Sequence, residues 1–389
     1  MNVIALSLLG LAAIGLAALT LQRLAVSRHL RAPLPWPKRR VAISVLKPLC
    51  GLDEGLAESL EEWASLDYPR YELLLGVRDM NDAAWPMARN LERRFLGKVR
   101  VVLQRGEPGL NPKVNQLITL AAQAKNEVLL VSDSNTRPAP GQLFELAALF
   151  DDDQVACVTN PVSGWGQRSL GALLDNLHLA SSIGPGQIGA KRVAGKDLVV
   201  GKSMALRRSA LKAIGGFEAF KDVLAEDYVI GTQLRAQKLA VVVAQSPAVN
   251  VAIHRPVGSF IKRYLRWSVI HRTAVALPTY GAQALLNPWP LTLVALFLAP
   301  SKAMLAASAL VLAAKALLDV SSARALTMRV GWKAAAVVPL KDLILFVAWC
   351  NGLFQRTIDW RGNRLRVGAG SRLMPVVGSV DLELGRAEA

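Results

Sequence analysis

The N-terminal stretch of the chain, residues 3–21, is apolar throughout and contains no charged residue. About 19 apolar or small residues in a helix can cross roughly 30 Å of hydrocarbon. The stretch lacks the basic start and the small-residue cleavage site of a signal peptide, so we expect an uncleaved transmembrane anchor over residues 1–23. The segment that follows is basic, with Arg23, Arg28, Arg31, Lys38, Arg39 and Arg40. Such an excess marks the cytoplasmic side of a span, which predicts a protein of the cell inner membrane whose middle part faces the cytoplasm.

Strongly apolar stretches also lie near the other end of the chain, at residues 285–300, 303–319 and 334–354. Lys315 interrupts the second stretch, and Lys341 with Asp342 interrupts the third. We expect transmembrane or re-entrant helices over residues 284–354 and a cytoplasmic tail over residues 355–389, giving a multi-pass protein.

The charges around the last apolar stretch restrict how these helices cross a membrane. Arg324, Arg329 and Lys333 favour a cytoplasmic loop before the stretch, and the basic segment 356–372 favours the cytoplasm after it. Three full spans cannot place both segments on the same side as the middle part of the chain. We therefore expect one stretch to be re-entrant or interfacial, and the interrupted stretch 334–354 is the best candidate.

Between the two apolar ends, segments typical of strands alternate with segments typical of helices. Apolar residues at helical spacing, such as Leu56, Leu60 and Trp63, indicate helices, whereas short continuous apolar runs indicate buried strands. The expected strands cover 41–46 (ended by Pro48), 71–77, 99–103 and 127–132. The first expected helix starts at Asp53 or Glu54, the second contains Met87, Leu91 and Phe95, and the third covers 111–124. The order βαβαβαβ predicts an α/β domain over residues 41–255 with a mostly parallel sheet.

Two aspartates lie just after the ends of expected strands, at the sheet edge where parallel sheets bind ligands. Asp133 follows the strand that ends at Ser132, and Asp79 follows the strand that ends at Val77, so we expect both to face one crevice. Asp133 can bind a divalent cation such as Mg²⁺ or Mn²⁺ through its carboxylate, or it can cap the next loop. Asp79 can accept hydrogen bonds from a ribose or a base, although Asp-Met-Asn-Asp is more typical of a turn.

Two further charged residues lie near the starts of expected helices. Lys113 belongs to Asn-Pro-Lys-Val-Asn, near a helix N-terminus that favours anions, so it can bind a phosphate or remain solvated. Asp227, in Glu-Asp-Tyr, can remove a proton from a hydroxyl group, or it can interact with the helix dipole as acidic residues in a first turn often do.

Residues 256–274 are expected to form an amphipathic interfacial helix. Phe260, Tyr264 and Leu265 lie near one face of this helix, and Arg263 and Arg266 lie elsewhere on it. Arg266 can also hold a diphosphate through its forked donors, with Trp267 packed against the substrate, and this interpretation is compatible with the first.

Charge and cysteine content exclude some other classes of protein. The 46 basic and 29 acidic residues give a net charge of +17, but the excess lies beside the apolar stretches, where anionic lipid explains it better than nucleic acid does. The three cysteines are far apart and form neither a disulfide framework nor a zinc pattern.

Taken together, these segments resemble the ceramide glucosyltransferase family (glycosyltransferase family 21), whose membrane-bound domain is of the GT-A type. The matching segments, in order, are Leu-Lys47-Pro-Leu-Cys-Gly51, Gly-Val-Arg-Asp79, Asn-Pro-Lys113-Val-Asn, Ser-Asp133-Ser-Asn, Gly201-Lys-Ser-Met204, Ala-Glu226-Asp227-Tyr, Arg263-Tyr-Leu-Arg266-Trp267 and Thr357-Ile-Asp-Trp360-Arg-Gly-Asn-Arg-Leu-Arg366-Val-Gly. The resemblance covers residues 41 to 370.

The resemblance implies a UDP-glucose donor, a ceramide acceptor and a divalent cation, Mg²⁺ or Mn²⁺. It implies that Asp79 contacts the uridine, that Asp133 binds metal and diphosphate with Lys113 on the donor, and that Asp227 is the base. Two arginines and a tryptophan would close over diphosphate and acceptor: Arg263, Arg266 and Trp267. Direct attack by the acceptor oxygen would invert the anomeric carbon.

The chain departs from the family's pattern at two places. Asn135 stands where many sugar-nucleotide enzymes have a second metal-binding aspartate, and residues 181–185 read Ser-Ser-Ile-Gly-Pro where eukaryotic members have a His-Pro pair. The alternative activity is transfer of another sugar, such as N-acetylglucosamine, to a hopanoid or diacylglycerol. A processive polysaccharide synthase and a non-enzymatic membrane scaffold are the other two hypotheses.

Overall fold

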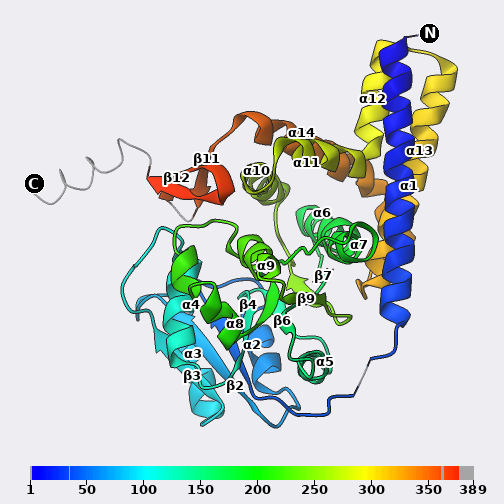
Figure 1. Ribbon diagram of the computed structural model, residues 1–389. Helices are drawn as coiled ribbons and strands as arrows, with labels where there is room; N and C mark the ends of the chain where they lie inside the picture. The colour runs from blue at the N-terminus through cyan, green and yellow to red at the C-terminus, as the bar shows by residue number, and fades with distance from the viewer. Residues whose placement is uncertain (1, 35, 361–362, 376–389) are drawn as a thin grey trace, which may run out of the picture.

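The computed structural model describes residues 2–34, 36–360 and 363–375. An α/β domain occupies the middle of the chain, and long helices from both ends of the chain stand beside it (Figure 1). Of the expected tail 355–389, residues 361–362 and 376–389 lie outside the described residues.

A seven-stranded sheet forms the centre of the α/β domain, in the order β3-β2-β1-β4-β8-β6-β9. The strands in this order are β3 (Val99–Leu103), β2 (Tyr71–Val77), β1 (Ile43–Pro48), β4 (Val128–Ser132), β8 (Ser203–Arg207), β6 (Val155–Thr159) and β9 (Ala240–Val243). β1, β2, β3 and β4 are parallel, and β8 runs antiparallel to both of its neighbours. The mostly parallel sheet predicted from the sequence is confirmed.

The first strand ends later than its proline suggests. We expected Pro48 to end the strand after Leu46, but Pro48 is itself the last residue of β1 and pairs with Gly76 of β2. A proline at the end of a strand removes only one backbone donor, and the N–H of Leu49 continues the ladder to the carbonyl of Gly76 at 2.8 Å. The pairing of β1 with β2 therefore continues to the carboxyl ends of these strands, the edge at which we expected a ligand to bind.

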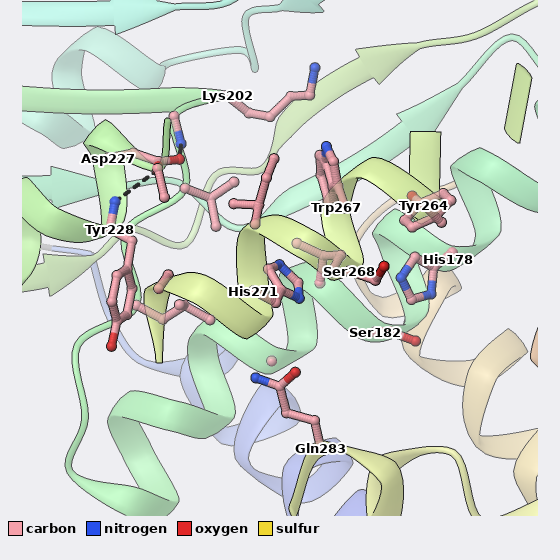
Figure 2. Close-up of a pocket in the computed structure, with 18 of the residues that line it drawn as sticks. His178, Ser182, Lys202, Asp227, Tyr228, Tyr264, Trp267, Ser268, His271 and Gln283 are labelled. Atoms are coloured by element: carbon pink, nitrogen blue, oxygen red, sulfur yellow. Dashed lines mark hydrogen bonds between the residues drawn. The ribbon is translucent and has the colours of Figure 1, made fainter. Parts of the chain in front are cut away.

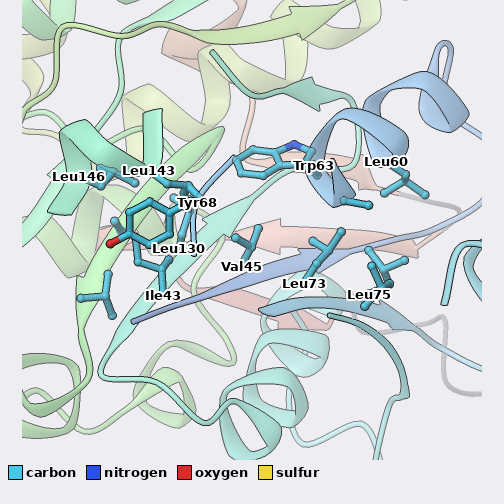
Figure 3. Packing of buried hydrophobic residues seen from close by; sticks show 14 of the residues in the cluster. Ile43, Val45, Leu60, Trp63, Tyr68, Leu73, Leu75, Leu130, Leu143 and Leu146 are labelled. Carbon is cyan, nitrogen blue, oxygen red and sulfur yellow. The ribbon is translucent and has the colours of Figure 1, made fainter. Parts of the chain in front are cut away.

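Helices cover both faces of the sheet. One face packs against α2 (Leu56–Ala64), α3 (Trp85–Arg94) and α5 (Gln142–Leu149). The other packs against α4 (Pro112–Gln123), α8 (Arg208–Ala213) and α9 (Glu226–Ala236), with η2 (Phe217–Phe220) beside them. Figure 3 shows the first face, where Val45 and Leu73 from the strands lie beneath Trp63 and Leu60 of α2. Each such side chain stabilises the fold by about 2 kcal/mol when fully buried.

A second, three-stranded sheet, β5-β10-β7, links this domain to the helices that follow. Its strands are β5 (Thr136–Arg137), β10 (Ala248–Val251) and β7 (Val162–Trp165). β7 leads into α6 (Leu170–His178), a π-helical segment η1 (Leu179–Ile183) and α7 (Gly184–Ala194). Such widened helical turns are frequent at functional sites.

The N-terminal helix α1 (Val3–Arg31) packs beside α12 (Pro288–Leu298) and α13 (Lys302–Ala325) (Figure 1). Among the residues that the structure describes, three helical segments are long and apolar enough to cross a membrane: Val3–Arg31, Lys302–Ala325 and Trp332–Phe354. The shorter pair Leu277–Leu286 and Pro288–Leu298 is bent by 85°. The bent pair lies before residues 334–354, the segment that we expected to be re-entrant or interfacial. That expectation stays a prediction, because Trp332–Phe354 is also long enough to span.

The remaining elements surround the boundary between the α/β domain and the long helices. They are α10 (Val257–Ala274), α11 (Leu277–Ala282), η3 (Gln283–Leu286), η4 (Trp332–Val337), α14 (Val338–Phe354), η5 (Ala369–Ser371) and the sheet of β11 (Thr357–Trp360), β12 (Asn363–Val367) and β13 (Leu373–Pro375). Helices α10 and α14 pack together, and α14 runs across the direction of α1 and α13 rather than alongside them (Figure 1).

The charges that interrupt the apolar C-terminal stretches are buried against one another. Lys315 Nζ lies 2.6 Å from Asp319 Oδ2, and Lys341 Nζ lies 3.0 Å from the same oxygen and also pairs with Asp342. None of these four side chains is more than 2% exposed. Two ammonium and two carboxylate groups thus hold α13 against α14, as expected for polar groups within apolar helices.

Candidate functional site

Asp133 lies at the carboxyl end of β4, and its backbone is held rigidly from within the domain. The buried ammonium group of Lys47 donates to the carbonyl oxygen of Asp133 at 2.7 Å and to that of Thr136 at 3.1 Å. Trp63 Nε1 also donates to the carbonyl of Thr136, at 2.9 Å. Burial lowers the pKa of Lys47 to about 7. These contacts fix the loop after the strand.

The carboxylate of Asp133 lies between two lysines. Lys113 Nζ is 2.9 Å from Oδ1, and Lys202 Nζ is 3.1 Å from Oδ2. Burial alone would raise the pKa of Asp133, but the two ammonium groups outweigh it and hold this pKa well below its usual range. Lys202 is only 5% exposed and also donates to Asn135 Oδ1 at 2.7 Å. Asp133 is therefore an ionised carboxylate among fixed cations.

Lys113 connects the sheet edge to the start of α9. The side chain of Asn111 caps α4 by accepting from the backbone N–H groups of Lys113 and Val114, which places Lys113 in the first helical turn. Its Nζ also lies 3.0 Å from Glu226 Oε1. Burial alone would lower the pKa of Lys113, but Asp133 and Glu226 outweigh it and raise this pKa above its usual value.

Asp227 is held by backbone donors at the start of α9. Its Oδ2 accepts from the N–H of Gly201 at 2.5 Å, and its Oδ1 accepts from the N–H of Tyr228 at 2.8 Å (Figure 2). A Cβ at position 201 would lie 2.8 Å from Lys113 Nζ and 3.0 Å from Asp227 Oδ2. The lack of a side chain on Gly201 thus lets the acid and the lysine approach the same backbone segment.

Helix α10 contributes arginine and aromatic side chains opposite these acids. Arg263 lies 5.2 Å from the centre of the Trp267 ring, and Trp267 packs edge-on against Tyr264 at 5.4 Å. Arg263 NH1 also lies 2.5 Å from Asp175 Oδ2, and Tyr264 donates to Asp175 Oδ1 at 3.0 Å. Asp175 is fully buried and pairs with Arg255 as well, so one carboxylate from α6 sets the position of α10.

One cavity of about 910 Å³ joins these groups to the long helices. Its charged end contains Lys113, Asp133, Lys202 and Asp227. Its apolar wall includes residues from α1, η1, α7, η3 and α14, among them Ala18, Leu21, Ile183, Val193, Leu286 and Phe346. The cavity therefore connects a cluster of fixed charges with helices that are apolar enough to lie in a membrane.

Six of the seven site residues predicted from the sequence line this cavity: Lys113, Asp133, Asp227, Arg263, Arg266 and Trp267. Asp79 does not. It is exposed after β2, and its Oδ1 accepts from the N–H of Asn81 at 2.8 Å, as in a turn. The structure thus brings Asp133 and Asp227 into one cavity and places Asp79 outside its lining. The role of Asp79 stays a prediction.

Four further residues of the site, to which we assigned no role from the sequence, are Lys47, Lys202, Glu226 and Asp175. The segments Leu-Lys47-Pro and Gly201-Lys-Ser were part of the resemblance and could have drawn attention to both lysines. Asp175 had no comparable signal, because its partner Arg263 is 88 residues away in the chain.

A divalent cation fits this site only in part. Within residues 2–34, 36–360 and 363–375, no three His, Cys, Asp or Glu side chains gather as a metal centre. The Asp133 carboxylate is ionised and its side chain is 26% exposed, so it suits a hard cation, which would share it with Lys113 and Lys202. Substrate phosphate oxygens would have to complete the coordination shell, as they commonly do for Mg²⁺.

Removing the charge of Asp175 is expected to destabilise the protein. Asp175→Asn leaves Arg255 and Arg263, whose side chains are mostly covered, without their shared counter-charge, which costs about 3 kcal/mol of unfolding free energy. Thermal unfolding of the full chain in detergent would measure the loss. Asp153→Asn removes an exposed partner of Arg39 and should change the stability by less than about 0.5 kcal/mol. Equal melting temperatures for the two variants would contradict this account.

Comparison with known proteins identifies the family to which this chain belongs. The sequence model of the family described as "Glycosyl transferase family 21" matches residues 5–373. Ceramide glucosyltransferase 1 of Caenorhabditis elegans is 28% identical over 227 residues, which are 58% of this chain and 48% of the relative. A ceramide glucosyltransferase of Pyricularia oryzae is 22% identical over 289 residues, covering 61% of this chain and 58% of the relative. The chain thus spans about half the length of the curated relatives it matches.

Among solved structures, the fold is similar to that of the mannosyltransferase PcManGT from Pyrobaculum calidifontis, which was determined with GDP-Man and Mn²⁺. The TM-score is 0.52 and the identity 20%, covering 90% of this chain and 99% of the other. At this identity the similarity supports the GT-A fold alone. The family match, in contrast, extends over nearly the whole chain, and the protein therefore belongs to glycosyl transferase family 21.

Proposed function

We propose that this protein is a membrane-bound, inverting glycosyltransferase that transfers glucose from UDP-glucose to the hydroxyl group of ceramide. The cavity that joins the charges around Asp133 and Asp227 to the apolar wall formed by α1, η1, α7, η3 and α14 carries the proposal. A sugar nucleotide is water-soluble and anionic, whereas its acceptor is embedded in lipid, so the reaction needs a site with one end suited to each.

The charged end of the cavity would bind the donor. Lys113, Lys202 and Arg266 lie around the Asp133 carboxylate or along the same wall, where they can neutralise a diphosphate. Arg263 and Trp267 would close over the diphosphate from α10. Asp79, which follows β2 on the far side of β1 from β4, would contact the uridine.

Asp227 would act as the general base. Its carboxylate would take the proton of the acceptor hydroxyl while that oxygen bonds to the anomeric carbon and the bond from this carbon to the donor phosphate breaks. The two backbone N–H donors from Gly201 and Tyr228 keep the carboxylate oriented for this step. Direct displacement gives a β-glycoside from an α-linked donor, with UDP as the second product.

The relatives' names make glucose and ceramide the first substrates to test, because both curated relatives described above are ceramide glucosyltransferases. The alternative is transfer of another sugar, such as N-acetylglucosamine, to a hopanoid or diacylglycerol. Residues 181–185 differ from the His-Pro pair of the eukaryotic members, and two of them, Ser182 and Ile183, line the cavity. The alternative acceptor rests on this difference.

The helices that can cross a membrane support the proposed location. We place the protein in the cell inner membrane, with the anchor at residues 1–23, the catalytic domain at 41–255 facing the cytoplasm, and residues 256–274 at the interface. The segment 284–354 would enter the membrane, and the tail from residue 355 would return to the cytoplasm.

Transfer should require a divalent cation. When bound by Asp133 and the donor, Mg²⁺ or Mn²⁺ would stabilise the charge on the leaving diphosphate. Adding excess EDTA to the detergent-solubilised full chain should lower transfer by at least about tenfold, and adding back Mn²⁺ or Mg²⁺ should restore it. Unchanged activity in EDTA would mean that Lys113 and Lys202 neutralise the diphosphate without a metal ion.

The activity itself can be tested with membranes from a host that expresses the full chain. These membranes would be incubated with labelled UDP-glucose or UDP-N-acetylglucosamine and with ceramide, a hopanoid or diacylglycerol. Membranes that contain the Asp227→Asn chain would give the background. We expect labelled glucosylceramide that β-glucosidase cleaves. Label in hopanoid or diacylglycerol alone would refute ceramide as the acceptor, and a polymeric product would favour a processive synthase. No product and no UDP-sugar binding would favour a scaffold.

A further inference from the structure

Three buried polar atoms without a hydrogen-bond partner belong to residues that line the cavity at its end near the long helices. They are His178 Nδ1 at the end of α6, Asn287 Oδ1 before α12 and Asp342 Oδ2 in α14. Asp342 Oδ2 lies 3.6 Å from Lys315 Nζ, and the other oxygen of the same carboxylate, Oδ1, pairs with Lys341. Buried polar atoms are usually paired, so three of them on the wall of one cavity point to a ligand.

These atoms lie apart from the donor end. In Figure 2, Asp227 and His178 lie on opposite sides of the view, with Trp267 between them and Ser182 close to His178. The His178 ring packs edge-on against Tyr264 with 4.7 Å between ring centres. Burial, together with the positive charges of Lys341 and Lys315, lowers the pKa of His178 well below its usual value. Its imidazole is therefore neutral at physiological pH, with one nitrogen able to accept.

The chemistry of the unpaired atoms restricts the ligand. The oxygens of Asn287 and Asp342 can only accept hydrogen bonds, so the ligand must donate. Two ammonium groups and two carboxylates balance one another at this end, in Lys315, Lys341, Asp319 and Asp342, so no net charge favours an anionic or cationic head group. The neighbouring cavity wall is apolar, with Leu345, Phe346 and Ile183.

We propose that this end of the cavity is a recognition site for the polar group of the acceptor lipid. It takes a neutral amphiphile that carries donor groups, hydroxyl or amide N–H, beyond the hydroxyl that becomes glycosylated. Each additional donor binds one of Asn287 Oδ1, Asp342 Oδ2 and His178 Nδ1, so a lipid with two such donors pairs two of these atoms, while the alkyl chains follow the apolar wall. This inference rests on the proposed function, because it assigns part of the acceptor to the same cavity.

The site also discriminates between acceptors. Ceramide has an amide N–H and a second hydroxyl in addition to the hydroxyl that reacts, whereas diacylglycerol has one hydroxyl and two ester groups that only accept. A bound diacylglycerol would leave the three acceptor atoms unpaired, and sites built to bind a donor group reject analogues that lack it. We expect kcat/KM for ceramide to exceed that for diacylglycerol by at least about 100-fold.

His178→Phe tests the contact directly. The change keeps a ring against Tyr264 and removes Nδ1. In the purified full chain with mixed micelles, the KM for ceramide should rise roughly tenfold and the KM for UDP-glucose should stay the same. His254→Phe replaces an exposed histidine outside the cavity lining and should change neither constant.

Ceramide analogues separate direct contact from a structural role. One analogue lacks the second hydroxyl and another carries a methylated amide, and each should bind the unmodified enzyme more weakly. If one of these donors binds His178, the His178→Phe effect shrinks to less than about twofold for the analogue that lacks it. Asn287→Leu, which removes a second acceptor atom, should likewise raise the KM for ceramide without changing the KM for UDP-glucose.

Two results would overturn the inference. One is an equal rise in KM for ceramide and both analogues in each variant, and the other is use of diacylglycerol as efficiently as ceramide by the unmodified enzyme. Failure of the proposed function is distinguishable, because the unmodified enzyme would then glycosylate none of the lipids.

Discussion

Replacing Asp227 by asparagine should lower kcat by roughly 10²–10⁴-fold and leave the KM for the donor nearly unchanged. Asparagine keeps the shape of the side chain and an oxygen that can accept from Gly201 or Tyr228. It cannot take a proton from the acceptor hydroxyl, so only the chemical step should suffer. Steady-state transfer by the purified full chain, measured against donor and acceptor concentration, separates the two constants.

A matched control for this variant is available on the same domain. Asp197→Asn removes a carboxylate that pairs with Lys191 and Arg235 and does not line the cavity, so kcat should stay within about twofold of the unmodified value. Full activity in Asp227→Asn would eliminate this residue as the base. A loss of donor binding in that variant would instead indicate that Asp227 shapes the donor site.

The fold could be predicted from the sequence as far as residue 133, because each strand or helix up to that point is indicated by the apolar pattern of its own residues. Strands 71–77 and 99–103 have the predicted limits, since each is a short apolar run between helices with apolar residues at helical spacing. Beyond Asp133 the sheet continues through β8, which runs antiparallel between β4 and β6. Nothing in the five residues Ser203–Arg207 indicates that direction, because it depends on the long excursion through α6 and α7.

The candidate site could be predicted where a motif places a residue at the end of a strand or the start of a helix. Asp133, Lys113 and Asp227 are such residues, and the structure brings them together. The pairing of Asp133 with Lys202 and that of Asp175 with Arg263 join residues 69 and 88 positions apart, so only the tertiary fold creates them. The same holds for the apolar C-terminal segments, where the sequence shows interrupting charges but not that they neutralise one another.

Asp133→Asn should have a different signature from Asp227→Asn, because Asp133 lies among cations rather than backbone donors. The change removes the carboxylate proposed to hold the divalent cation and leaves Lys113 and Lys202 without this partner. We expect kcat/KM for the donor to fall by about 10³-fold, since a metal ion contributes several kcal/mol of charge stabilisation in the transition state. Initial rates at low donor concentration would measure this loss, with Asp152→Asn, an exposed aspartate outside the cavity lining, as the control.

Binding of UDP gives a second and independent readout for Asp133→Asn. In the unmodified protein, Mn²⁺ should tighten UDP binding measured by calorimetry, whereas the variant should bind UDP equally well with Mn²⁺ and with EDTA. In EDTA the variant should bind UDP at least as tightly as the unmodified protein, because two ammonium groups that now pair with Asp133 become available to the diphosphate. UDP binding that still responds to Mn²⁺ in Asp133→Asn would place the cation on other residues, and weaker binding in EDTA would show that Asp133 mainly orients the two lysines.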